Sequence, residues 1–197
     1  MLQQLFIDNI VFALIIWGFI YLGDYYLTLY GARLYVANGK EHLSIQGSYE
    51  LTPTFQKDVD RLRLVSPRFF AFVVLSSALI FCIWFLSVQI LAMPEFYLFL
   101  LGGLMLREAV IHIRHWRNIT TFRLAAHPNA MQGMIGYSKW TSYRMSATEL
   151  LSFAVLYLLI GLTVGSWFLF GGAFACMVLS IQHQLLARRM LKLPSRA

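Results

Sequence analysis

Long apolar runs separated by short polar segments are the dominant pattern of this chain. A helix needs roughly 20 predominantly apolar residues to cross the hydrocarbon core of a bilayer, and most of these runs are about that long. Five transmembrane helices are therefore expected, over residues 5–30, 67–92, 94–118, 146–162 and 167–187. The pattern predicts an all-α, polytopic membrane helix bundle that forms a single transmembrane domain over residues 1–197.

Local signals place the start of several of these helices. Ser66 followed by Pro67 is typical of a helix cap with proline at the first helical position, and Pro94 opens the next helix in the same way. Ser146 with Glu149 three residues later fits a capping box, in which both side chains bond to the backbone at the start of a helix. The fourth helix is therefore expected to begin at Ser146, with Glu149 as its capping carboxylate.

Two small elements are predicted in the cytoplasmic insert between the first two helices, residues 32–66. The pair Asn38-Gly39 between short apolar stretches is a strong signal of a β-hairpin. A short helix capped by Thr52-Pro53 should follow, with its apolar side chains on one face, as in a helix that lies on the membrane surface. The members of that face are Phe55, Val59 and Leu62. The other cytoplasmic loop is expected over residues 119–145.

Composition agrees with a membrane protein, and the distribution of charge predicts its orientation. Charged residues make up only 13% of the chain, against roughly a quarter in an average soluble domain. All 16 Lys and Arg residues lie toward one side of the helix pattern, whereas the segments on the other side hold Asp8 and Glu95 but no Lys or Arg. The positive-inside rule then places the N-terminus outside and the C-terminus inside.

The expected surroundings of the chain follow from the same pattern. We expect a multi-pass protein of a bacterial-type inner (plasma) membrane, in contact with the lipid bilayer. The net charge of +7 fits the positive-inside bias and an attraction to anionic headgroups. No basic stripe stands clear of the membrane, so no nucleic-acid partner is expected.

A short repeat links the third and fifth helices. Residues 99–103 read FLLGG and residues 168–172 read FLFGG, and each run continues into a helix that ends in His and Arg residues. The repeat could reflect a duplicated helical hairpin, as in many transporters. It could also reflect helix packing alone, because small residues let two helices approach closely.

The sharpest set of candidate functional residues lies on the third helix. At about 100° per residue, Glu108, His112 and His115 fall at about 0°, 40° and −20° and share one face. Counted from Phe96, Glu108 lies roughly 18 Å into a core about 30 Å thick. An ionisable residue that faces lipid at the centre of a bilayer costs about 2.5–3.5 kcal/mol or more, so these side chains should face other helices.

Further polar residues are predicted at a similar depth. Asp24 shares its helix face with Thr28 and could pair with Arg107 or join the histidines; alternatively it reaches water at the interface. His183 on the fifth helix could join His112 or Asp24 across the bundle. The resulting polar layer toward the cytoplasmic leaflet comprises Asp24, Arg107, Glu108, His112, His115 and His183.

Three roles suit this polar layer. It could relay protons, because imidazole titrates near neutral pH, or its members could pair only to hold helices together. It could also bind a divalent metal through His112, His115 and Glu108, provided that another helix supplies further ligands. No catalytic residue can be assigned, because the chain has no HExxH, P-loop, GxSxG or dinucleotide-binding motif.

The hypothesis from sequence is a small transporter or channel subunit that handles a proton, an ion or a small polar solute. It would be a homo-oligomer or bind a partner within a membrane complex, because five short helices enclose little room. One alternative is an intramembrane enzyme with a His/Glu site that acts on a lipid at the cytoplasmic interface. Another is a structural subunit whose buried polar residues only direct assembly.

Overall fold

A computed structural model describes residues 2–46 and 54–192, and five of its helices are long and apolar enough to cross a membrane. These helices are α2 (Ile10–Leu34), α4 (Pro67–Trp84), α5 (Pro94–Leu124), α6 (Lys139–Val164) and α7 (Trp167–Lys192). The π-helical turns η1 (Tyr35–Gly39) and η2 (Phe85–Ile90) extend α2 and α4. The prediction of an all-α bundle with five such helices is confirmed.

Four short elements complete the described part of the chain. Helix α1 (Leu2–Asp8) precedes α2, and α3 (Gln56–Asp60) precedes α4. Strands β1 (Leu43–Ile45) and β2 (Ile135–Tyr137) form a two-stranded parallel sheet.

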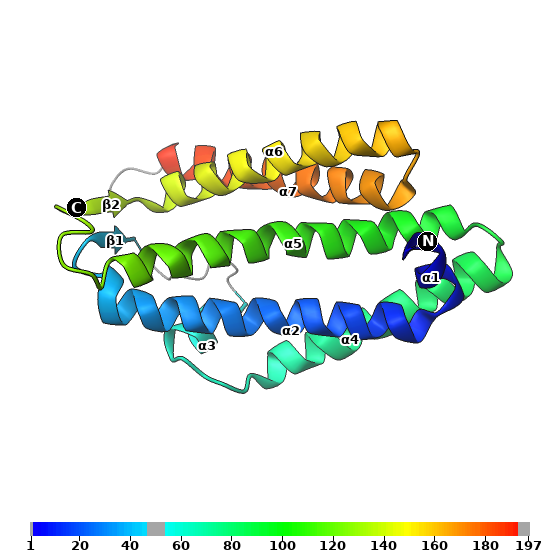
Figure 1. The fold of residues 1–197 in the computed structure, drawn as a ribbon, viewed down its shortest axis with the longest axis horizontal. Coiled ribbons are helices and arrows are strands. Elements are labelled where there is room, and N and C mark those ends of the chain that lie inside the picture. The colour runs from blue at the N-terminus through cyan, green and yellow to red at the C-terminus, as the bar shows by residue number, and fades with distance from the viewer. Residues whose placement is uncertain (1, 47–53, 193–197) are drawn as a thin grey trace.

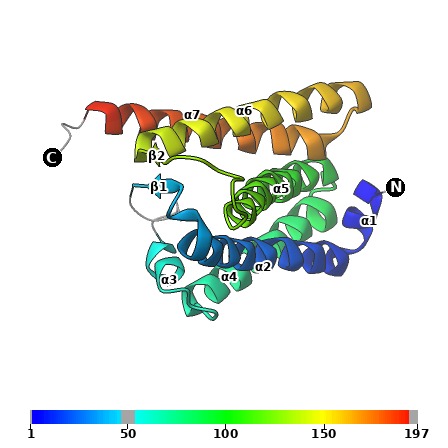
Figure 2. The same cartoon turned by 60° about the vertical axis from the view of Figure 1, so that its left-hand side comes forward.

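The helices form three layers, with α5 in the middle. Helix α5 lies between α2 on one side and α7 on the other, while α6 packs along α7 and α4 packs mainly against α2 (Figures 1 and 2). Helix α1 and the last turns of α7 lie at opposite ends of the bundle, and β1 and β2 lie at the end where α7 ends (Figure 1). The central helix α5 therefore presents two separate faces on which side chains of other helices can meet it.

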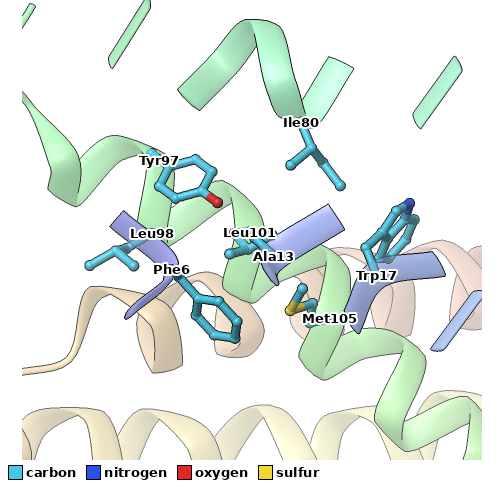
Figure 3. Packing of buried hydrophobic residues seen from close by; sticks show 8 residues of the cluster. All are labelled: Phe6, Ala13, Trp17, Ile80, Tyr97, Leu98, Leu101 and Met105. Atoms are coloured by element: carbon cyan, nitrogen blue, oxygen red, sulfur yellow. The ribbon is translucent and has the colours of Figure 1, made fainter. Parts of the chain in front are cut away.

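The largest apolar core joins α2, α4 and α5 toward the N-terminal end of the bundle. Trp17, Tyr97 and Leu101 are each 1% exposed there, and Ile80 of α4 covers them (Figure 3). The Trp17 indole donates a hydrogen bond to the Ser76 hydroxyl, 2.9 Å away, so its polar atom is satisfied inside the core.

The two diglycine runs form the crossing point of α5 and α7. A Cβ atom at Gly102 would overlap the carbonyl oxygen of Phe168, and a Cβ at Gly171 would overlap the carbonyl oxygen of Phe99. The contact is reciprocal, since each run places its glycine against the phenylalanine carbonyl of the other. This supports the packing explanation of the repeat, while the surrounding hairpins differ, because α6 packs along α7 and α4 does not pack along α5 in the same way.

The predicted β-hairpin at Asn38-Gly39 is wrong. Both residues lie in the π-helical turn η1 that continues α2, and the Asn38 amide donates a hydrogen bond to the Phe122 carbonyl of α5 at 3.4 Å. Packing against the end of α5 thus overrides the local turn preference. Strand β1 pairs instead with β2, whose residues lie far along the chain, with Leu43 opposite Ile135.

The predicted capping box of α6 is also wrong. The helix begins at Lys139, seven residues earlier than expected, and Ser138 is its N-cap. Ser146 and Glu149 lie inside the helix, where both bond to residues of neighbouring helices. In addition, α5 runs on to Leu124, so the loop between the two helices is shorter than the 119–145 expected.

The short helix α3 packs against the ends of α2 and α4. Val59 is 1% exposed and lies in a cluster with Tyr25 and Phe69. The buried Asp58 accepts hydrogen bonds from Ser66 at 2.6 Å and from Arg63 at 3.4 Å. The predicted cap at residues 52 and 53 lies outside the described residues.

Candidate functional site

A carboxylate and an imidazole meet between α2 and α5. His115 Nε2 lies 3.0 Å from Asp24 Oδ1 and 3.1 Å from Thr28 Oγ1. Asp24 and Thr28 are one turn apart on α2 and so share a face, and His115 is only 8% exposed. The predicted meeting of Asp24 with the histidine face of α5 is therefore present in the structure.

The hydrogen bonds around Thr28 fix the position of a proton on His115. The Thr28 hydroxyl donates to the Asp24 carbonyl at 2.9 Å, so its oxygen can only accept from His115. The ring must then carry its proton on Nε2. The other ring nitrogen, Nδ1, is buried and has no hydrogen-bond partner among the described residues.

A second buried carboxylate lies two turns before His115 on the same helix. Glu108 is 3% exposed and forms an ion pair with Arg107 through one oxygen. Its other oxygen, Oε2, and the Arg107 Nε atom are buried without a hydrogen-bond partner in the described part of the chain. Arg107 thus pairs with its neighbour on α5 and not with Asp24.

His112 lies between these two groups and directly over the backbone of α2. Its Nδ1 is 2.8 Å from the Glu108 carbonyl, to which it donates. A Cβ atom at Gly23 would lie 2.9 Å from His112 Nε2, so the glycine lets the imidazole approach α2 closely. We call the set Asp24, Thr28, Arg107, Glu108, His112 and His115 the α2–α5 site.

A second polar cluster lies on the other face of α5. Arg114 Nε is 2.7 Å from Glu149 Oε2, and Arg117 Nη1 is 3.1 Å from Glu149 Oε1. The carboxylate of α6 therefore joins two arginines of α5. Nearby, His183 Nδ1 lies 2.7 Å from the Ser146 hydroxyl.

His183 accordingly belongs to a different cluster from the one predicted. The structure pairs it with Ser146 of α6 and with the ring of Tyr143, whose centroid is 5.3 Å away in an edge-on arrangement. It does not bring His183 to Asp24 or His112. Helix α5 separates the two polar clusters, because α2 and α7 pack on its different sides (Figure 2).

The proposed metal ligands do not converge. His112 bonds to its own helix and His115 bonds to Asp24. Over residues 2–46 and 54–192, no three His, Cys, Asp or Glu side chains are grouped so that they could hold a metal ion. The ligand geometry therefore gives no support to a metal centre at Glu108, His112 and His115.

The link between Arg114 and Glu149 was missed at the sequence level. The two residues are 35 positions apart, so no local pattern connects them. Counted from the opposite ends of their helices at about 1.5 Å per residue, however, both fall at nearly the same depth. Matching the depth of acidic and basic residues across helices could have found this pair.

The fold and the site together define a bundle of five helices long and apolar enough to span a membrane, with two polar clusters between them. Comparisons with protein families, with curated proteins and with solved structures found no match to this chain.

Proposed function

We propose that the chain is a small integral membrane protein that takes up and passes on protons at the α2–α5 site, as a transporter or channel subunit. Three observations support a proton over a metal ion. The site contains two carboxylates and two imidazoles, each of its histidines has one nitrogen that is not engaged as a donor, and no three of these side chains converge as metal ligands would. The contact of His115 Nε2 with Asp24 at 3.0 Å carries the proposal.

We place the proton at the pair that His115 forms with Asp24. The imidazole Nε2 lies 3.0 Å from the Asp24 carboxylate, and Nδ1 is the ring nitrogen that would take up the proton. The imidazole would then be a cation beside a carboxylate, and release of the proton would leave it neutral.

Other side chains of α5 that can bind a proton lie close to His115. Glu108, His112 and His115 follow one another at intervals of four and three residues, which places them on one face over a rise of about 10 Å. Each faces α2 or the interior of the bundle. Side chains arranged in this way are typical of proton relays in membrane proteins.

A structural role for the same residues has support of its own. Arg107 pairs with Glu108, and Asp24 pairs with His115, which is also what helix pairing alone would require. The second cluster fits this role better than the α2–α5 site, since Glu149 is paired on both oxygens. The two roles differ in one respect: only proton handling requires Glu108 or His115 to change protonation state.

Infrared difference spectroscopy of the bilayer-embedded protein tests this distinction. Spectra recorded between acidic and alkaline pH should show a buried carboxyl band that gains and loses a proton. We expect the band to disappear in Glu108→Gln, whereas Asp24→Asn removes the carboxylate that faces His115 and should keep the band. Asp8→Asn is the matched control, because Asp8 is an exposed carboxylate at the end of α1, far from this site, and accepts a hydrogen bond from Gln4.

Proton uptake by reconstituted liposomes provides the functional measurement. With a membrane potential imposed, a pH-sensitive dye inside should report acidification faster than in protein-free liposomes. Loss of an acid–base group from a relay typically slows proton transfer by about 100-fold or more, so His115→Gln should approach the protein-free rate. A carboxyl band and a proton flux that are both unaffected by all three site variants would rule out the proposal.

A further inference from the structure

One polar side chain of α7 faces away from the rest of the bundle. Gln182 is exposed, and its amide has no partner among the described residues. Other exposed polar side chains, on the neighbouring helix α6, form hydrogen bonds to the backbone of their own helix. The Thr148 hydroxyl donates to the Arg144 carbonyl at 3.1 Å, and the Ser152 hydroxyl donates to the Thr148 carbonyl at 3.0 Å.

The depth of Gln182 makes this exposure costly. It lies 15 residues after Trp167, the first residue of α7, or about 22 Å into a hydrocarbon core about 30 Å thick. Lipid tails offer the amide neither a donor nor an acceptor. An unpaired amide at this depth favours association with another helix that can bond to it.

The surface around Gln182 is apolar and exposed, as expected where a second helix packs. Val178, Ile181 and Leu185 flank it and are 48%, 50% and 50% exposed. With Leu186 and Arg189 they line a shallow groove of about 300 Å³ on α7. Spacings of three and four residues place this set on one helix face, as in helices that pack side by side.

We propose that this face of α7 is the interface between two copies of the chain, with the two Gln182 side chains hydrogen-bonded to each other. A carboxamide carries both a donor and an acceptor, so it is complementary to its own copy across a twofold axis. Both copies have the same orientation in the membrane. Their α7 helices therefore run parallel and meet with equivalent residues at equal depth.

The neighbouring charge is compatible with this arrangement. Arg189 lies seven residues beyond Gln182, about 10 Å closer to the cytoplasmic surface, where anionic headgroups offset the charges of two nearby arginines. The opposite side of α7 is already occupied, because Cys176, Ser180 and Ala187 are buried within the bundle. The interface is separate from the α2–α5 site, so this proposal does not depend on proton handling.

Disulfide cross-linking in the membrane tests the contact directly. In a Cys82→Ala background, where the remaining Cys176 is buried, mild oxidation should convert Gln182→Cys into a covalent dimer. Leu158→Cys on α6, with a similar exposure of 42%, is the matched control and should remain monomeric. Equal cross-linking at both positions, or none at Gln182→Cys, would overturn the proposal.

Energy transfer between labelled copies at increasing lipid dilution tests the role of the amide. One interhelical hydrogen bond in a bilayer contributes enough to change a dissociation constant by up to about tenfold. Gln182→Leu should therefore weaken the dimer by up to that factor, whereas Gln182→Asn should retain more of the association. A monomeric wild-type protein that instead retains an anionic lipid through Gln182 would count against a second copy as the occupant.

Discussion

The pairing of Asp24 with His115 predicts that these two residues contribute to stability together. Asp24→Asn and His115→Ala should each lower the free energy of unfolding, and the double variant should lose less than the sum. Residues in direct contact typically show a coupling of about 0.5–3 kcal/mol. Unfolding in mixed micelles measures all four proteins of this cycle.

The control for this cycle combines the Asp24 substitution with a substitution at a residue that Asp24 does not contact. Asp24→Asn combined with Arg117→Met joins residues that belong to different clusters, and their effects should add. A coupling for Asp24 and His115 no larger than the control value would show that the 3.0 Å contact does not stabilise the fold.

The two arginines that bind Glu149 differ in burial, so their replacement should lower the free energy of unfolding by unequal amounts. The Arg114 side chain is 15% exposed and that of Arg117 is 52% exposed. Arg114→Met should cost about 3 kcal/mol, because it breaks a largely buried ion pair. Arg117→Met should cost less than about 1 kcal/mol, as solvent-exposed pairs do. Thermal or chemical unfolding compares the variants, and equal losses would contradict the assignment.

At the scale of elements, the crossing of α5 and α7 should tolerate no side chain at its glycines. Gly102→Ala and Gly171→Ala each force a methyl group into a backbone carbonyl, which no rotamer change can relieve. The helices must separate, at a cost of about 1–3 kcal/mol or more. Gly18→Ala is the matched control, since a Cβ there meets nothing within 4 Å.

In that control the free energy of unfolding should stay constant or rise by up to about 1 kcal/mol, because alanine favours the helix over glycine. Thermal unfolding in detergent gives both values. A Gly102→Ala protein as stable as Gly18→Ala would show that α5 and α7 do not approach each other as closely as the structure indicates.

The sequence predicted the existence of the long helices, because their apolar runs follow from the need to match the bilayer. It predicted the residues at which the helices begin and end less well. The apolar runs located all five helices, and Pro67 and Pro94 marked two starts correctly. The predictions of a capping box at Ser146 and of a hairpin turn at Asn38 were wrong, because both side chains bond to other helices. A capping or turn motif shows only which local bonds are available, and tertiary contacts decide whether they form.

At the scale of the whole molecule, the candidate site could be predicted only in part. Helical periodicity placed Glu108, His112 and His115 on one face, and the cost of exposing them to lipid required a partner helix. Periodicity cannot tell which helix lies opposite, so His183 was assigned to the wrong cluster. The three-layer arrangement around α5 (Figure 1) is what divides the polar residues into two groups.

The orientation of the bundle in the membrane remains a prediction from the positions of Lys and Arg, and it decides which leaflet the α2–α5 site approaches. Cysteines introduced one at a time into the Cys82→Ala background, where the remaining Cys176 is buried, test it through labelling with a membrane-impermeant maleimide. Met93→Cys, in the turn between η2 and α5, should react in intact cells. Gln132→Cys, in the loop between α5 and α6, should react only after permeabilisation. Both positions are exposed, so accessibility within the protein does not distinguish them.

Labelling of permeabilised cells serves as the control, because both cysteines should then react to the same extent. The reverse pattern in intact cells would place the arginine-rich end outside and contradict the positive-inside rule for this chain. His115 lies about 28 Å along α5 from Phe96, near the end of the bundle that holds β1 and β2. A reversed orientation would therefore move His115 from the cytoplasmic leaflet to the outer one, and the proposed proton uptake would have to begin from outside the cell.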